Sequence, residues 1–196
     1  MTSITANQLR AGDIIVSTTG AGVSGVTRGG TGSSVSHSML YIGNQNVIEA
    51  IATGVTKRTL TQALREASLA IALRRRNTTQ AIRTAVVSQA ESYASRRLAY
   101  DEIGAAGAGA ASTNRGRLLA SIACGLSPIA CGAGASAVAR NAHAGQADRA
   151  FFCSELVARV FELAGAPITD LSPSFTTPRH VRMSSQLLYV GHLKDT

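Results

Sequence analysis

The stretch FFCSELVARVFELA, residues 151–164, decides the fold because it is the clearest helix in the chain. Gly165 follows it as a stop signal, two residues before Pro167. A helix with one apolar face has to pack against another element, so this segment predicts a partner layer elsewhere in the chain. The apolar positions that share its face are Leu156, Val157, Val160, Phe161 and Ala164.

The sequence before this helix predicts the partner layer as a set of short strands separated by turn residues. The tetrapeptide Gly43-Asn44-Gln45-Asn46 is one such turn, and it predicts a hairpin. Strands come first and helices later, so we expect an α+β fold in which a small antiparallel sheet packs against the helix. The predicted strands are residues 14–16, 35–42, 47–51, 54–60, 68–73 and 186–193, and the other predicted helices are residues 61–67 and 79–95.

Length and composition predict one compact domain over residues 1–196, with a Gly/Ala-rich insertion at about 104–150. The chain is 45% hydrophobic and 15% charged, which excludes a wholly disordered polymer. Its four prolines and the lack of a Gly-X-Y period exclude a fibrous protein.

The charge balance of 19 basic to 11 acidic residues, a net charge of +8, favours an acidic partner. Aromatic residues make up 4% of the chain and tryptophan is missing, so nucleic acid ranks below a cell-wall polymer or a membrane surface. An equally good interpretation is a solvated basic face that carries Arg74, Arg75 and Arg76.

Two segments bear on export and membranes. Residues 1–10 have no basic region followed by an apolar run, so we expect no secretory signal peptide. Residues 118–139 are uncharged, but they contain Pro128 and few large apolar side chains. We therefore expect a buried helical hairpin there and no stable membrane span.

Cysteine chemistry is suggested by Cys153, which stands at the start of the decisive helix. Backbone N–H groups and the helix dipole there favour the thiolate, although most free cysteines are buried and inert. A nucleophilic thiol needs a base and a group that orients the base. His37 and Glu49, on the two strands of the hairpin, are candidates for these roles, and each is also compatible with a purely structural role. A three-residue loop would separate them by four ladder positions, about 13 Å, so a bulge or strong twist is needed.

No metal or cofactor site is predicted. The three cysteines lack CxxC spacing, and there is no HExxH sequence. Residues 20–25 match GxGxxG after a strand, but no helical pattern follows. We interpret residues 20–34 as a mobile flap or rim.

Several short motifs together resemble the circularly permuted branch of the NlpC-type papain-like cysteine hydrolases, in which histidine precedes cysteine. The resemblance covers residues 11–58 and 151–190. The motifs are Gly12-Asp13-Ile14-Ile15, Ser36-His37-Ser38-Met39-Leu40-Tyr41-Ile42-Gly43, Val47-Ile48-Glu49-Ala50, Tyr100-Asp101 and Phe152-Cys153-Ser154-Glu155-Leu156-Val157.

This resemblance implies a permuted papain-like fold with Cys153 as nucleophile, His37 as general base and Glu49 as the group that orients the imidazole. It also implies a substrate-lining hydroxyl at Tyr100 and an oxyanion donor at the backbone N–H of Cys153. Asp13 and Asp101 are interpreted as turn or capping residues. The chain departs from the family pattern in its long insertion and in His180, which is predicted to lie in a Pro178-Arg179-His180 turn.

The predicted function is a cysteine amidase or endopeptidase that cleaves peptidoglycan peptide stems through an acyl-enzyme. By analogy, the protein would be made in the cytoplasm and delivered to the periplasm of a rival cell, with an immunity protein and a secretion-machine component as partners. One alternative is a lipid-directed acyl hydrolase or acyltransferase whose membrane-facing element is 118–139. Another is a non-catalytic binding module with an inert Cys153.

Cys124 and Cys131 flank a segment that contains Pro128, which can turn the chain back on itself. We hypothesise a disulfide between them in an oxidising compartment. The competing interpretation is two small buried thiols on a cytosolic helix pair.

Overall fold

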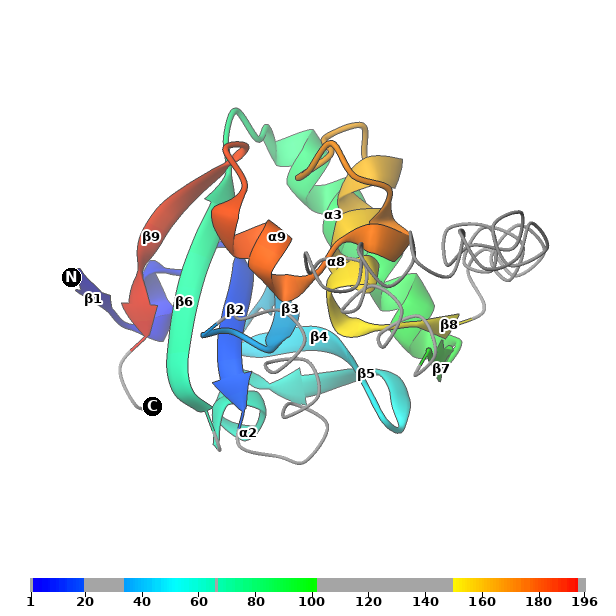
Figure 1. Ribbon diagram of the computed structural model, residues 1–196, viewed down its shortest axis with the longest axis horizontal. Coiled ribbons are helices and arrows are strands. Elements are labelled where there is room, and N and C mark those ends of the chain that lie inside the picture. The colour runs from blue at the N-terminus through cyan, green and yellow to red at the C-terminus, as the bar shows by residue number, and fades with distance from the viewer. Residues whose placement is uncertain (1, 20–33, 66, 102–149, 194–196) are drawn as a thin grey trace, which may run out of the picture.

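The computed structural model describes residues 2–19, 34–65, 67–101 and 150–193. Its main feature is a seven-stranded sheet in the order β1-β9-β6-β2-β3-β4-β5 (Figure 1). Neighbouring strands run antiparallel, except that β1 and β9 are parallel. The strands are β1 (Ser3–Ile4), β2 (Ile14–Thr19), β3 (His37–Gly43), β4 (Asn46–Ile51), β5 (Gly54–Thr59), β6 (Ala67–Arg75) and β9 (Leu187–Leu193).

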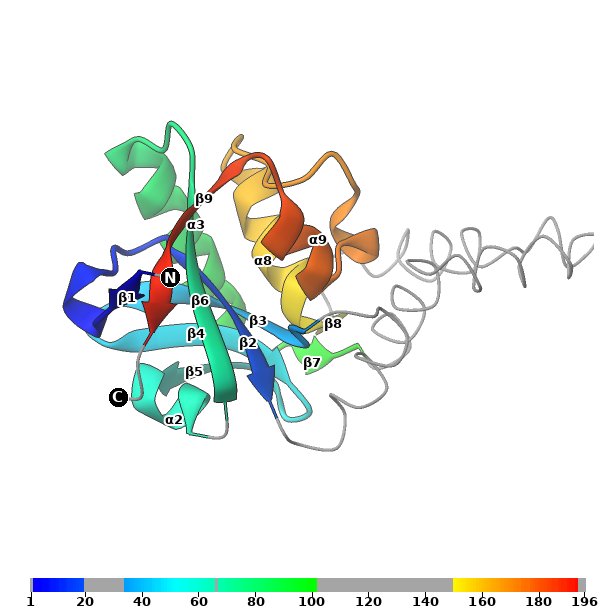
Figure 2. The same ribbon diagram turned by 60° about the vertical axis from the view of Figure 1, so that its left-hand side comes forward.

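Helices cover the two faces of this curled sheet unequally (Figure 2). The longer helices α3 and α8 pack against each other and against β3, β4 and β5. The short helix α2 contacts β4, β5 and β6. The helices are η1 (Ala6–Gln8), α2 (Leu60–Leu64), α3 (Gln80–Ser95), α8 (Cys153–Leu163), η2 (Pro173–Phe175) and α9 (Pro178–Met183).

Alternation along the strands produces two apolar cores, one on each face of the sheet. The core under α3 and α8 contains Leu40 and Ile48 from the hairpin and Leu156 and Phe161 from α8. The other core contains Met39, Val47 and Leu60. The fold is therefore α+β, with the sheet packed against the helix that begins at Cys153.

The β3–β4 hairpin has a register that sequence spacing did not predict. The turn has two residues, Asn44 and Gln45, and both have positive φ angles of 49° and 56°. The pairing then shifts between Tyr41 and Gly43, so that Tyr41 faces Val47. This irregularity places Glu49 opposite Met39, which is only two positions from His37 along the ladder. The gap is two positions instead of the expected four, because the turn has two residues instead of three and the bulge removes one further position.

Most predicted elements are confirmed, with two differences at the C-terminal part of the chain. The decisive helix begins at Cys153 and not at residue 151, because β8 (Ala150–Phe151) pairs in parallel with β7 (Ala99–Tyr100). The predicted turn at His180 was wrong. Thr177 caps a helix there by accepting the His180 N–H at 3.3 Å, and Pro178 is pre-organised for the first helical position.

Of Arg74, Arg75 and Arg76, interpreted from the sequence as a solvated basic face, Arg76 is exposed and the other two are partly buried. Arg74 forms an ion pair with the buried Asp13, at 2.7 Å from Nε to Oδ1. Arg75 donates from Nε to the Pro167 carbonyl at 3.0 Å, and Arg76 donates from Nε to the Ser185 carbonyl at 2.9 Å. The three guanidinium groups therefore tie loops to the end of β6.

Several predictions fall outside the described residues. They are the GxGxxG match and flap at 20–34, of which only residue 34 is described, the uncharged stretch 118–139 and the Cys124–Cys131 disulfide. Among the described parts of the chain, no helix has the length and apolarity to cross a membrane.

Candidate active site

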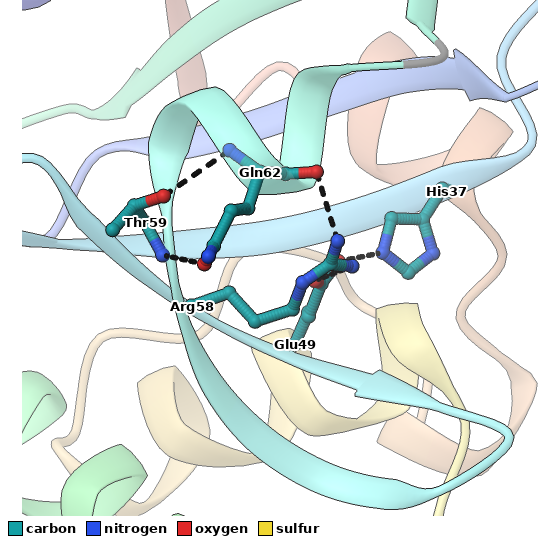
Figure 3. Close-up of polar contacts among 5 residues, drawn as sticks. All are labelled: His37, Glu49, Arg58, Thr59 and Gln62. Carbon is teal, nitrogen blue, oxygen red and sulfur yellow. Dashed lines mark hydrogen bonds and ion pairs between the residues drawn. The ribbon is translucent and has the colours of Figure 1, made fainter.

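His37 is the first residue of β3 and lies directly across the ladder from Ser17 of β2. The Ser36 N–H donates to the Ser17 carbonyl at 2.9 Å, which fixes the entry of the strand. The imidazole Nε2 lies 2.6 Å from Oε2 of Glu49 (Figure 3). The His37 side chain is 13% exposed and that of Glu49 is 2% exposed, so the imidazole is at the edge of the core and the carboxylate is inside it.

Cys153 is the first residue of α8, and it is buried. Two contacts hold this end of the helix. The Glu155 carboxylate accepts the Phe152 N–H at 3.4 Å, and the Ser154 hydroxyl donates to the Thr176 carbonyl at 2.6 Å. Because the first N–H groups of a helix have no partner within it, this position offers donors to a negatively charged sulfur.

In the structure the Cys153 thiol and the His37 imidazole, which are 116 positions apart in the sequence, lie close enough to shift each other's pKa. Burial opposes ionisation of the Cys153 thiol, but the charge and hydrogen bond of His37 and the backbone N–H groups of Ser38 and Ser154 outweigh it. The pKa of Cys153 is therefore lowered. Burial likewise opposes a charged His37, yet Cys153 and then Glu49 raise its pKa to about 10. The two shifts together favour a thiolate–imidazolium pair.

Glu49 is charged in spite of its burial. Burial alone would raise the pKa of its carboxyl, but the hydrogen bond and charge of His37, followed by those of Arg58, lower it. Arg58 Nη1 donates to Oε1 at 2.9 Å, so each carboxylate oxygen has a partner of its own. Arg58 was not among the residues singled out from the sequence. The sequence feature that points to it is its spacing on the next strand. Arg58 is two residues after Thr56, which pairs with Glu49, so its side chain lies on the same face of the sheet as that of Glu49.

The other predicted residues take different positions. Tyr100 lies in β7 opposite Phe151, two residues before Cys153, and packs partly against the core. Its role toward a substrate stays a prediction. Asp13 accepts the Arg10 N–H at 2.8 Å, which agrees with a turn residue, but its ion pair with Arg74 was not foreseen. The Asp101 N–H donates to the Phe151 carbonyl at 3.1 Å.

Across residues 2–19, 34–65, 67–101 and 150–193, no group of three or more His, Cys, Asp or Glu side chains is arranged to hold a metal ion.

Comparisons with known proteins place the chain beside one peptidase and one solved structure. No protein-family model matches it. It is 29% identical to "Probable lipoprotein peptidase YaeF" of Escherichia coli K12, over 97% of this chain and 73% of that protein. It resembles the crystal structure of the metalloprotein yiiX from Escherichia coli O157:H7, with a TM-score of 0.61, 18% identity, and coverage of 94% of this chain and 97% of that one. The second likeness concerns the fold alone.

Proposed function

We propose that the chain is a cysteine hydrolase of amide bonds, with the peptide stems of peptidoglycan as its substrate. The observation that carries the proposal is the placement of His37 between Glu49 and Cys153. A base in contact with both a thiol and a buried carboxylate is the arrangement that nucleophilic catalysis by cysteine requires. The similarity to a protein named as a probable peptidase supports a hydrolase. The order of His37 before Cys153 in the chain fits the permuted NlpC-type pattern.

The reaction would run in two stages on these groups. The Cys153 thiolate attacks the amide carbonyl, and the backbone N–H of Cys153 donates to the oxyanion that forms. His37 then gives its proton to the departing nitrogen as the C–N bond breaks, which leaves an acyl-enzyme and a free amine. In the second stage neutral His37 takes a proton from water, the hydroxyl attacks the thioester, and the released Cys153 thiolate restores the ion pair.

The peptidoglycan substrate is supported by charge. The chain carries a net charge of +8, and cell-wall polymers are acidic, so attraction would concentrate the protein on its substrate. Delivery to the periplasm of a rival cell, with an immunity protein and a secretion-machine component as partners, is part of this proposal by analogy with cell-wall-cleaving toxins.

The test is digestion of purified sacculi, with released fragments identified by mass spectrometry. The expected products are muropeptides with a new amine and a new carboxylate at one amide bond. The Cys153→Ala protein, matched in concentration and checked for folding by circular dichroism, should release none.

Phospholipid vesicles serve as the competing substrate in the same experiment. Release of fatty acid from vesicles, with intact sacculi, would replace the amidase with a lipid-directed acyl hydrolase. Failure on both substrates, together with a Cys153 that iodoacetamide does not modify in the folded protein, would favour a binding module.

A further inference from the structure

Arg58 touches the candidate site from the side opposite to the thiol, and the reaction above makes no use of it. It lies on β5, where its backbone pairs with Val47, so that Arg58 is the diagonal neighbour of Glu49 across the two strands. Its Nη1 donates to Glu49 Oε1 at 2.9 Å (Figure 3). Its Nη2 donates to the carbonyl of Gln62 at 2.8 Å, so the guanidinium is held at two points.

The second of these points belongs to a rigid element. Helix α2 is fixed at its start by reciprocal bonds: Thr59 Oγ1 accepts the Gln62 N–H at 3.2 Å, and Gln62 Oε1 accepts the Thr59 N–H at 3.2 Å. Leu60 and Ala63 anchor the helix in the core. The Gln62 carbonyl is among the last four of the helix, which have no partner within it, so it is free to accept from Arg58.

We infer that Arg58 is a positioning residue that holds the Glu49 carboxylate so that Oε2 faces His37. The inference rests on the proposed function, because it assigns Arg58 a place in the same catalytic chain. The contacts run from α2 through Arg58 and Glu49 to His37 and Cys153. The three links from Gln62 to His37 are hydrogen bonds of 2.8, 2.9 and 2.6 Å in that order.

The geometry of the contact supports positioning over simple charge neutralisation. Arg58 bonds a single oxygen of Glu49, and the other oxygen remains for His37 at 2.6 Å. A guanidinium can instead cover both oxygens of a carboxylate, as Arg74 covers those of Asp13 at 2.7 Å each. Anchoring to Gln62 turns the Arg58 guanidinium so that this two-oxygen contact is not made.

Loss of Arg58 would leave Oε1 of the buried Glu49 without its donor, and the carboxylate would be able to rotate away from His37. A less well-held carboxylate stabilises the imidazolium less, and the imidazolium in turn stabilises the Cys153 thiolate less. The thiolate would then require a higher pH. This change is visible in the thiol itself, without any substrate.

The experiment compares Arg58→Gln, Arg58→Lys and a matched control, Lys57→Gln. Lys57 is the adjacent residue and loses the same charge, but it lies on the other face of the strand in an exposed pair with Glu91. Alkylation by iodoacetamide is followed at Cys153 by peptide mass spectrometry between pH 5 and 10, and sacculus hydrolysis gives kcat and KM.

The expected result for Arg58→Gln is alkylation at pH 6 about tenfold slower than in the unsubstituted chain, and kcat about tenfold lower with KM within about twofold. Arg58→Lys should recover part of both losses, and Lys57→Gln should change neither. If Arg58→Gln unfolds, Arg58→Lys alone decides the question.

An unchanged alkylation profile in a folded Arg58 variant overturns the inference. A variant whose melting temperature falls while its alkylation profile and kcat stay unchanged overturns it as well. A shifted profile in a chain that does not digest sacculi supports the positioning role and rejects the substrate. A Cys153 that reacts at pH 6 no faster than an ordinary thiol rejects the catalytic pair, and the inference with it.

Discussion

Asp13 and Glu49 are both buried carboxylates paired with an arginine of the same sheet, but their oxygens are used differently. Both oxygens of Asp13 accept from Arg74, and Oδ2 also accepts the Arg10 N–H. Glu49 gives one oxygen to Arg58 and the other to His37. The first carboxylate has all its partners in the scaffold, whereas the second has one partner, His37, to which the proposed function assigns the role of general base.

The surroundings of the two pairs explain their different uses. Asp13 ends a turn in which its N–H donates to the Arg10 carbonyl at 2.9 Å, and Gly12 supplies the φ of +93° that this turn requires. The Asp13 carbonyl also accepts the Tyr41 N–H at 2.8 Å. The pair with Arg74 therefore ties the entry of β2 to β3 and β6. Glu49 is instead in the middle of a strand, and its side chain is its main connection to the site.

The largest effect on activity is expected at His37 and Cys153, the residues that Glu49 supports and Asp13 does not. His37→Ala and Cys153→Ala should each lower sacculus hydrolysis by at least about 10³-fold, because nucleophile and base act as one unit. Circular dichroism should show an unchanged fold, and the double variant should be barely worse than either single one. Hydrolysis near the unsubstituted rate by Cys153→Ala would reject the assignment outright.

Much of this arrangement was readable from the sequence, because it depends on local patterns. The Gly43–Asn46 turn and the alternation around it predicted that His37 and Glu49 share one face. The helical period after Cys153 placed the thiol at a helix start. These features are decided by residues within one turn or one strand, where spacing is a reliable guide.

The parts that sequence reasoning missed depend on long-range geometry. The need for a bulge or strong twist was predicted, but its position at Ile42, between Tyr41 and Gly43, was not. Arg74 reaches Asp13 across 61 positions. Arg58 is only nine positions from Glu49, but the contact requires the β4–β5 register and the position of α2. In a basic chain, the sequence around an arginine does not by itself indicate which carboxylate the arginine will contact.

The next effect separates the two carboxylates directly. Glu49→Gln should lower kcat by about 10- to 10²-fold, less than His37→Ala, because a correctly placed imidazole keeps part of its function without its orienting group. Asp13→Asn is the matched control, since it makes the same change at the scaffold pair, and it should keep kcat within about twofold. Equal losses of kcat in Glu49→Gln and Asp13→Asn would show that the two carboxylates do not differ in their importance for activity.

A smaller effect concerns pH. Because the pKa of Cys153 is lowered and that of His37 is raised to about 10, the thiolate–imidazolium pair should exist over a wide range below pH 10. Iodoacetamide should therefore modify Cys153 at pH 6 at a rate within about threefold of that at pH 8, whereas an ordinary thiol slows by about 10²-fold.

Two variants test the cause of this profile. In Glu49→Gln the alkylation midpoint should move upward, because the imidazolium loses the carboxylate that stabilises it. In Asp13→Asn the midpoint should stay in place. A free-thiol profile in the unsubstituted chain would mean that the ion pair does not form.

The smallest effect on activity is expected at Arg74. Its replacement tests whether the pair with Asp13 contributes to stability alone. Arg74→Gln removes a guanidinium from a carboxylate that is 1% exposed, and one partner of a buried pair is then left without its counter-charge. We expect the free energy of unfolding to fall by about 2 to 3 kcal/mol, measured by urea denaturation. At temperatures well below the melting point, kcat and the Cys153 alkylation profile should be unchanged. Lys57→Gln, which breaks an exposed pair, should alter stability by less than about 0.5 kcal/mol. If an Arg74 variant kept its stability but lost kcat, the roles assigned to the two pairs would be reversed. Activity would then depend on the pair of Arg74 and Asp13.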